Sequence, residues 1–444
     1  MTIIQKVWKY KIHHALPVAV ILLDIIPLYF FPKAVVLSSV AVLTAVLFWL
    51  NRKKLHIHHL PVFLFWGALA SCVIAFRYVP DEVLLPQGLS KATALEGVLA
   101  ADARRTSRGS YIYELKLDKV YMQNIEQTMG GTVTLFASAE KGFWGDMVRF
   151  ERVKLGKDGK SFSSKKMVYL GSRNSFFAAR RRAVEAFTAK IQLVYGQKSF
   201  LAEALLTGSR DNLDPMLKEQ FRRAGVSHVL ALSGMHLGII ALFVFFIVRR
   251  FAGPRFSILA VNVVNVFYLL MAGISPSLLR AVIMFALVSL GKLMGNKASL
   301  MRILVFTFSF SLMIFPGYFF SISFQLSFLA LAGILLFTVP ITNSLEKFMP
   351  DLLATGIACS LAAVIMTAPV TFYNFGVVYP AGIITSMVIS PVVTLYMCLG
   401  LGCVLVPAPL LMAVGLLQQT LLNWLFYLIS AVVGFASMVP GIAL

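Results

Sequence analysis

The stretch SHVLALSGMHLGIIALFVFFIV, residues 227–248, has the length and apolar character of a membrane-spanning helix, yet its first half is polar. Two serines and two histidines lie in that half: Ser227, His228, Ser233 and His236. Each polar group that enters hydrocarbon without a partner costs roughly 2–7 kcal/mol. Helical spacing would bring these side chains to nearby parts of one side, and Gly234 and Gly238 would let a neighbouring helix approach closely. We therefore predict a polar, tightly packed seam that faces a protein interior or a water-filled path. The same side chains could instead serve only to hydrogen-bond to another helix.

Composition places the chain among polytopic membrane proteins. It has 444 residues, of which 59% are hydrophobic, and a mean hydropathy of +0.82. The net charge is +21, from 40 basic and 19 acidic residues. Part of this excess is the usual flanking of spans by basic residues, and the remainder indicates contact with a polyanion, either phospholipid headgroups or nucleic acid.

Apolar runs predict a polytopic α-helical membrane protein with about 10–11 spans. Residues 1–86 form an N-terminal transmembrane part, with spans at about 16–31, 34–50 and 60–78. Residues 226–444 form a second transmembrane domain, in which the opening stretch is followed by spans at about 256–272, 277–293, 303–319, 324–339, 352–369, 383–406 and 410–438, the last as one or two segments. Basic residues at the N-terminus and in the loop at 52–54 predict that the third span exits to the outer face.

Residues 87–175 have a different pattern, which predicts a soluble β-domain on the outer face. Five short runs alternate with period two: TALEGVLAA, SYIYELKLDKVYM, GTVTLFAS, DMVRFERV and KKMVYLGS. Five strands in a region of this size fit a small all-β barrel such as an OB-fold, although other β-domains would give a similar pattern. Residues 91–173 carry 15 basic and 9 acidic residues.

An OB-fold binds single strands by stacking bases on aromatic rings within a cationic groove. The candidate nucleic-acid contacts are the cations and aromatic residues of this domain: Arg104, Arg105, Tyr111, Tyr113, Phe143, Trp144 and Arg149. The alternative is that the aromatic rings fill the core of the barrel. Tyr111 and Tyr113 share one face, and the pattern does not decide whether that face is buried.

Residues 176–225 predict amphipathic or interfacial helices with many basic side chains. Arg180, Arg181 and Arg182, and then Arg222 and Arg223, fall on the outer side in the predicted topology. Two explanations stay open. These helices lie on the headgroups, or they form a basic collar for incoming phosphates.

Further polar groups occur within the second transmembrane domain. Arg280 follows the start of a span, where a charge costs roughly 2.5–3.5 kcal/mol on insertion scales, and Gln325 and Ser327 lie in the next apolar run but one. Such groups are typical of a bundle interior that lines a path. For Arg280 the alternative is that its side chain reaches the outer headgroups.

Three blocks of sequence are similar to the ComEC competence family of inner-membrane DNA channels. The first is LLTGSRDNLDPMLKEQFRRAGVSHVLALSGMHLGII at 205–240, the second is GISPSLLRAVIMF at 273–285, and the third is PGYFFSISFQLSFLALAGI at 316–334. The resemblance covers about residues 90–400. It implies an OB-like domain at the position predicted above, and a channel for single-stranded DNA in the cytoplasmic membrane during natural transformation.

On this resemblance, the path would be lined by His228, Ser233, His236, Arg280, Gln325 and Ser327. Many relatives carry a metallo-β-lactamase-like nuclease domain, but this sequence has no HxHxDH motif, so we expect a form without it and no enzymatic activity. No Walker motif is present, so the DNA receptor, nuclease and ATP-driven motor would be separate proteins. We expect no cofactor and no metal site, because the histidines at 56, 58 and 59 lack an accompanying ligand set. A homodimer is left open.

Two other classes of function stay open from the residues alone. One is a membrane-embedded transporter of a small molecule or lipid. The other is an intramembrane hydrolase with Ser233 as nucleophile and His236 or His228 as base. No acidic residue near these positions in the sequence would orient the base, which favours the channel over the hydrolase.

Overall fold

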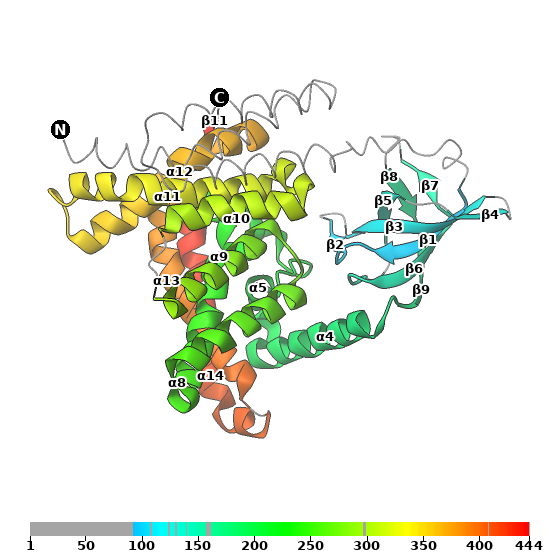
Figure 1. Cartoon of the computed structure of the whole chain (residues 1–444), viewed down its shortest axis with the longest axis horizontal. Helices are drawn as coiled ribbons and strands as arrows, with labels where there is room; N and C mark the ends of the chain where they lie inside the picture. The colour runs from blue at the N-terminus through cyan, green and yellow to red at the C-terminus, as the bar shows by residue number, and fades with distance from the viewer. Residues whose placement is uncertain are drawn as a thin grey trace.

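The structure is a computed structural model that describes residues 92–443, apart from short gaps at 107–108, 123–124, 129–130, 139, 157–160, 296–298 and 407. The predicted spans at 16–31, 34–50 and 60–78, and the histidines at 56–59, lie outside the described residues. Figure 1 shows a small β-domain beside a helical bundle, with helix α4 (Ser175–Tyr195) leading from one to the other. The predicted fold class, a polytopic helical membrane protein with an inserted β-domain, is confirmed.

All five predicted alternating runs of the β-domain fold as strands. They are β1 (Ala94–Leu99), β3 (Tyr111–Met122), β5 (Thr132–Ala137), β6 (Asp146–Glu151) and β9 (Lys166–Ser172). The same sheet includes the shorter strands β2 (Arg104–Arg105), β4 (Ile125–Thr128), β7 (Lys154–Leu155) and β8 (Ser161–Ser164).

Strand pairing closes this sheet into a barrel. The order is β7-β8-β5-β3-β1-β6-β9, with β8 parallel to β5 and β9 antiparallel to β6. Only Lys165 separates β8 from β9, so the two act as one strand that joins both ends of the sheet. The result is a five-stranded Greek-key barrel of the OB type, as the alternating runs predicted.

Alternate residues of these strands fill the barrel core, because successive side chains of a strand point to opposite faces. Leu95, Tyr113, Leu115 and Phe150 are fully buried there. At Gly97 the β1–β3 register shifts, and a Cβ would lie 2.0 Å from the main-chain oxygen of Lys116. The barrel therefore requires a glycine at this bulge.

A series of short helices follows α4. They are η2 (Gly196–Lys198), α5 (Ser199–Leu206), α6 (Pro215–Arg223) and α7 (Ser227–Leu230). Helix α6 begins with a local start signal: the Asp214 carboxylate accepts the Met216 amide at 2.9 Å, and proline occupies the first helical position. Helix α5 is not interfacial, because residues 201–206 are all buried.

The bundle is built from long apolar helices. They are α8 (Gly234–Ala272), α9 (Pro276–Leu293), α10 (Leu300–Ile314), α11 (Ile322–Leu345), α12 (Asp351–Phe375), α13 (Gly382–Leu405) and α14 (Ala408–Ala436), with the short η3 (Pro316–Phe320) before α11. A final strand, β11 (Ile442–Ala443), pairs with β10 (Val377–Val378). Within the described residues, six of these helices are long and apolar enough to cross a membrane, whereas α10 is shorter.

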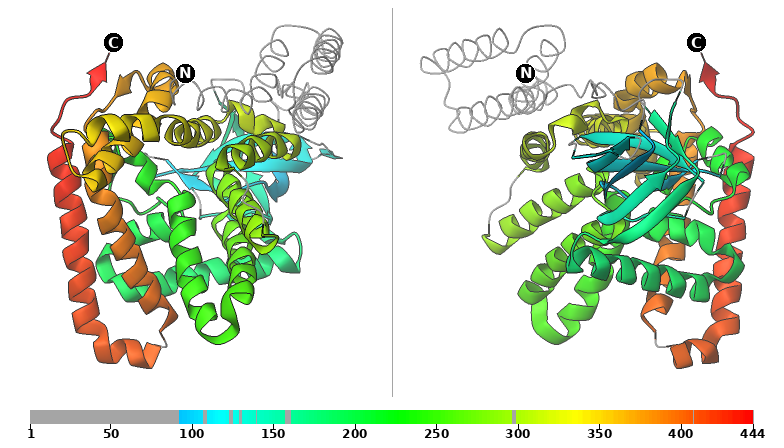
Figure 2. Two further views of the ribbon diagram at one scale, coloured as in Figure 1. Left: turned by 60° about the vertical axis from the view of Figure 1, so that its left-hand side comes forward. Right: turned by 90° about the vertical axis from the view of Figure 1, so that its right-hand side faces the viewer.

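Helix α8 consists of two arms. Its 39 residues would extend about 58 Å as one straight helix, nearly twice the ~30 Å hydrocarbon core of a bilayer. Gly253 breaks it with a φ of 78°, immediately before Pro254, and Figure 2 shows the chain turning back at this end. The break falls between the stretch at 227–248 and the span predicted at about 256–272. By contrast, α14 is one continuous helix where one or two segments were predicted.

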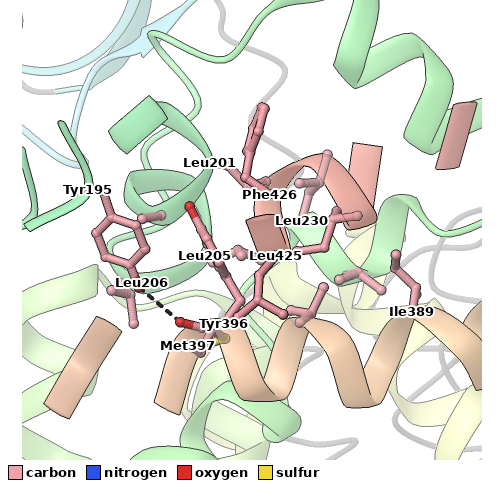
Figure 3. Packing of buried hydrophobic residues seen from close by; sticks show 14 of the residues in the cluster. Tyr195, Leu201, Leu205, Leu206, Leu230, Ile389, Tyr396, Met397, Leu425 and Phe426 are labelled. Atoms are coloured by element: carbon pink, nitrogen blue, oxygen red, sulfur yellow. Dashed lines mark hydrogen bonds between the residues drawn. The ribbon is translucent and has the colours of Figure 1, made fainter. Parts of the chain in front are cut away.

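Helices α4 and α5 are anchored in the bundle by an apolar core shared with α13 and α14. Figure 3 shows Tyr195, Leu201 and Leu205 packed against residues of those two helices. The Tyr195 hydroxyl donates to the main-chain oxygen of Tyr396 at 3.2 Å. The segment that follows the β-domain is therefore part of the membrane domain's own core.

Helices α11 and α12 pack along each other and run across α13 and α14 (Figures 1 and 2). The two backbones come close at Gly333, where a Cβ would lie 2.3 Å from the main-chain oxygen of Ala362. The small residues at this crossing let the two backbones touch.

Candidate functional site

The polar start of the 227–248 stretch is not one continuous helix. Helix α7 ends at Leu230, Ala231 has extended backbone (φ −83°, ψ 135°), and α8 begins at Gly234. The prediction that helical spacing places His228 and His236 on one side is therefore wrong, because non-helical backbone separates them. His228 is exposed on α7, whereas His236 is fully buried in α8.

Ser233 and His236 do meet, as a capping box at the start of α8. The Ser233 hydroxyl accepts the Met235 amide at 3.2 Å and lies 3.0 Å from Nδ1 of His236. The Ser233 amide donates to the same Nδ1 at 3.3 Å. Because an amide N–H only donates, this geometry assigns Nδ1 as an acceptor, and a neutral ring then carries its proton on Nε2. Within the described residues, Nε2 has no hydrogen-bond partner. The capping box thus leaves one buried donor open.

A second polar group forms where α9 meets α11. Ser327 donates to the hydroxyl of Ser277 at 3.1 Å, and the guanidinium of Arg280 lies 5.8 Å from the ring centroid of Phe328. Across the described part of the chain, Nε of Arg280 and the hydroxyl of Ser275 are buried without a partner.

Gln325 is close to this second group in sequence, but its amide is already engaged. Its side chain donates to the main-chain oxygen of Phe319 at 2.9 Å, which ties α11 back to η3. The structure therefore gives Gln325 a local capping bond as well as a place near the α9–α11 contact.

The two polar groups flank one helix–helix contact. Leu237 and Ile240 of α8 belong to the same buried cluster as Leu278 of α9. A Cβ on Gly234 would lie 3.6 Å from that of Ala281, the residue after Arg280, which is ordinary packing distance. A Cβ on Gly238 would meet nothing within 4 Å. A neighbouring helix therefore lies at contact distance from Gly234, as predicted, but not from Gly238.

Two of the predicted nucleic-acid contacts are core residues of the β-domain. Tyr113 is 0% exposed, and its hydroxyl donates to the main-chain oxygen of Glu140 at 2.6 Å. Phe143 is also buried. Neither ring is open to a base, so the core-filling alternative holds for both. Tyr111 is half-buried, with its ring 6.2 Å from that of Tyr113.

The remaining predicted contacts have different surroundings. The Trp144 ring packs edge-on against Phe177 of α4 at 5.1 Å. Arg149 pairs with Glu96 at 2.6 Å, and its guanidinium lies over the Tyr121 ring, so its charge is already engaged within the β-domain. Arg104 and Arg105, by contrast, are exposed on β2.

Arg180 fixes the β-domain to the bundle, a role that the sequence did not reveal. Its guanidinium forms a bidentate pair with Asp102, at 2.8 and 2.7 Å. It also donates to the main-chain oxygens of Leu270 and Met271, at 2.7 and 3.0 Å, at the end of α8. The Arg180 side chain is 2% exposed, so it is neither on the headgroups nor in a basic collar.

A second contact joins the β-domain to the loop at 207–214. Lys141 pairs with Asp211 at 2.6 Å and donates to the hydroxyl of Ser209 at 2.9 Å. Arg105 donates from its main chain to the Asp211 carboxylate and from its side chain to the Asp211 main-chain oxygen, both at 3.2 Å. Together with the bonds of Arg180, these contacts hold the β-domain, at β2 and Lys141, against the bundle.

A family model described as Competence protein matches residues 205–444, which is more than half of the chain. The chain belongs to the Competence protein family. It is 30% identical to an uncharacterized protein of Aquifex aeolicus (strain VF5) over 192 residues, which are 43% of this chain and 44% of that relative. It is 27% identical to ComE operon protein 3 of Bacillus subtilis (strain 168) over 177 residues, which are 39% of this chain and 22% of that relative. The chain thus spans less than half the length of either curated relative, and no solved structure matches it.

The Competence protein match begins within α5 and includes both polar groups and the loop at 207–214. Arg180, Asp102 and Lys141 lie before it. The sequence signal for Arg180 was weak, because it is one of three consecutive arginines and its partner is 78 residues away. An isolated aspartate followed by two arginines, at 102–105, was the only local hint of an ion pair there.

Proposed function

We propose that this chain is the channel through which single-stranded DNA crosses the cytoplasmic membrane during natural transformation. Membership of the Competence protein family supports a role in DNA uptake. The helices long and apolar enough to cross a bilayer support a multi-pass membrane location. The OB-type barrel supports contact with a single strand, because this fold combines cationic and aromatic side chains on one surface.

The observation that carries the proposal is the set of unsatisfied polar atoms beside the α8–α9 contact. His236, Arg280 and Ser275 each bury a polar atom without a hydrogen-bond partner in the described structure. Each such atom costs about 1–3 kcal/mol, which water or a passing polar ligand would recover. The proposed path is lined by His228, Ser233, His236, Arg280, Gln325 and Ser327.

The β-domain would receive the strand on the outer face. The rings of Tyr113 and Phe143 are buried and are therefore excluded. The proposed contacts that remain are Arg104, Arg105, Tyr111, Trp144 and Arg149. The proposed partners are single-stranded DNA, the lipid bilayer, and separate receptor, nuclease and motor proteins. A second copy of the chain stays a further candidate partner.

A transformation assay tests the path. A transformable host that lacks its own channel gene is complemented with Arg280→Ala or His236→Ala, and membrane levels of each variant are measured in parallel. We expect at least a tenfold loss of transformants at normal membrane levels, whereas Arg250→Ala, just before the Gly253 break in α8, keeps them. Normal transformation by both path variants would remove these residues from the mechanism.

One contact favours a second candidate, the intramembrane hydrolase. The Ser233 hydroxyl lies 3.0 Å from Nδ1 of His236, within reach of a nucleophile and its base. However, Nε2 of His236 has no partner within the described residues, so no carboxylate orients the ring. Labelling of the purified protein by a fluorophosphonate, lost in Ser233→Ala, would support the hydrolase; we expect no labelling.

A further inference from the structure

Four cations gather where β2 meets the loop at 207–214. They are Arg104, Arg105, Lys141 and Arg210. The Asp211 carboxylate lies among them and accepts from Lys141 and from the Arg105 amide. Two of the neighbouring acids are engaged with other groups. Asp102 is taken by Arg180, and the buried Glu203 accepts bonds from Gln192, Ser199 and Asn212.

Both oxygens of the Asp211 carboxylate already have partners. Its Oδ2 accepts from Lys141 at 2.6 Å and from Ser209 at 2.9 Å, and its Oδ1 accepts from the Arg105 amide at 3.2 Å. Within the described residues, no carboxylate pairs with Arg104 or Arg210. These two guanidinium groups therefore keep their full charge open to a ligand.

The backbone brings the two arginines together. Arg105 is hydrogen-bonded to Asp211 through both its amide and its guanidinium. Arg104 directly precedes Arg105, and Arg210 directly precedes Asp211, so these bonds bring the two arginines near each other. The two guanidinium groups also lie within electrostatic range of each other: burial is the main cause that lowers the pKa of Arg210, and the positive charge of Arg104 adds to it. Two like charges held together without a counter-ion form a site for an anion.

Arg210 also reaches the start of the proposed path. Its Nη2 donates at 3.1 Å to the main-chain oxygen of Leu230, the last residue of α7. Three residues later, Ser233 begins the capping box with His236. A ligand on Arg210 would thus lie between the β-domain and the polar group of the bundle.

We propose that Arg104 and Arg210 form a phosphate-binding pair that holds one phosphodiester of single-stranded nucleic acid as it passes from the β-domain to the bundle. The guanidinium fork matches phosphate geometry, and two forks from different domains would hold the backbone without reading the base. This inference rests on the proposed function and deepens it.

The surroundings favour nucleic acid over a phospholipid headgroup. Residue 105 pairs in register with Tyr111, a half-buried aromatic ring, and cations beside such a ring are typical of single-strand binding surfaces. Headgroup-binding surfaces also insert large apolar side chains. In the described parts of 92–122 and 199–214, no large apolar side chain is exposed; Phe136 of β5 and Met216 of α6 are exposed outside these two stretches.

The test is salt-dependent binding of a fluorescent oligothymidine to the full chain in neutral-lipid nanodiscs. For single strands, the slope of log affinity against log salt is about −0.7 per phosphate contact. We expect Arg104→Ala and Arg210→Ala each to weaken binding and to reduce the slope, and the double variant to reduce it by about 0.7, the contribution of the one phosphate that the pair holds. The control is Arg255→Ala, an exposed arginine at the Gly253 turn, which should leave the slope unchanged.

Arg210 also bonds to Leu230, so loss of its side chain could disturb the fold. Arg104 makes no bond to another side chain within the described residues, so Arg104→Ala keeps the test valid, and Arg210→Lys retains charge while removing the fork. We expect Arg210→Lys to keep the slope and to bind more weakly than the wild type.

Three outcomes would overturn the inference. If the wild type binds the oligonucleotide and both alanine variants keep its salt slope, the pair does not contact phosphate, although the proposed function stands. If the alanine variants keep oligonucleotide binding and lose only their binding to anionic-lipid nanodiscs, measured without oligonucleotide, the pair binds lipid headgroups. If the wild type binds no oligonucleotide at low salt, the proposed function fails together with this inference.

Discussion

The role of a charged residue in this chain depends on its partner rather than on its neighbours in sequence. Arg180 and Arg182 are two residues apart in one basic run, yet Arg180 is buried and Arg182 is exposed. The difference is Asp102, which forms a bidentate pair with Arg180, while main-chain oxygens at the end of α8 satisfy its other donors. A single guanidinium thus joins the β-domain, α4 and α8.

Removing this side chain should loosen the junction. Breaking a buried ion pair by deleting one partner costs roughly 3–5 kcal/mol, because the other charge is left unpaired. We expect Arg180→Ala to lower the thermal unfolding midpoint of the full chain in detergent and to increase proteolysis near residue 175. Arg182→Ala, two residues away, should change neither. Equal effects from the two variants would show that the Asp102 pair does not hold the junction.

Asp146, at the start of β6, predicts a pH effect. Burial raises the pKa of its carboxyl group above the ordinary value of 3.8, and this outweighs the bond from the Phe143 amide and the charge of Arg181. The native state therefore holds a proton at pH values where the unfolded chain has lost it. That contribution to stability is present below pH 3.8 and is lost as pH rises through the native pKa.

We expect Asp146→Asn to flatten the decline of the thermal unfolding midpoint as pH rises above about 3.8, since an amide does not titrate. Asp118→Asn, an exposed position on β3, serves as the control and should follow the wild type. An unchanged pH profile for Asp146→Asn would contradict the assignment.

At the scale of elements, small residues matter where backbones touch rather than where they form a motif. Gly234 and Gly238 have the small-xxx-small spacing, yet an added Cβ meets only ordinary packing or open space. Gly333 has no such partner four residues away, but lies against the α12 backbone at Ala362. Only the fold shows which glycine the packing requires.

Gly333→Ala should therefore separate α11 from α12. A Cβ there would lie 2.3 Å from a main-chain oxygen, and overpacking of this kind costs about 1–3 kcal/mol. We expect a lower thermal unfolding midpoint for Gly333→Ala, with Gly238→Ala at or above the wild-type value because its helix loses a glycine. The reverse order would contradict the α11–α12 packing.

For the whole molecule, the period of the hydrophobic pattern was sufficient to predict the architecture. Period-two runs predicted the five long strands of the barrel, and apolar runs predicted the helices from α8 to α14. The wrong predictions arose where the tertiary structure, rather than the local pattern, decides the path of the backbone or the direction of a side chain. The break at Ala231 interrupts a run that reads as one helix, and Tyr113 faces inward because of how the barrel closes.

The candidate site was predicted only in part for the same reason. Ser233 and His236 are three residues apart, so their contact followed from local geometry. Arg180 and Asp102, and likewise Lys141 and Asp211, are separated by about 70 residues or more, and no local pattern indicates such pairs. The junction between the β-domain and the bundle therefore emerges only from the fold.

The central claim is that nucleic acid passes the polar groups beside the α8–α9 contact, and trapping a strand in transit tests it most directly. A photocrosslinking amino acid is placed at Met284, one turn after Arg280 on the same side of α9, and, as a matched control, at Phe251, which is 84% exposed on α8. Labelled DNA is then supplied to transformable cells and irradiated during uptake. We predict a covalent DNA adduct at position 284 and none at position 251. DNA uptake at the normal rate, with no adduct at position 284, would contradict the account.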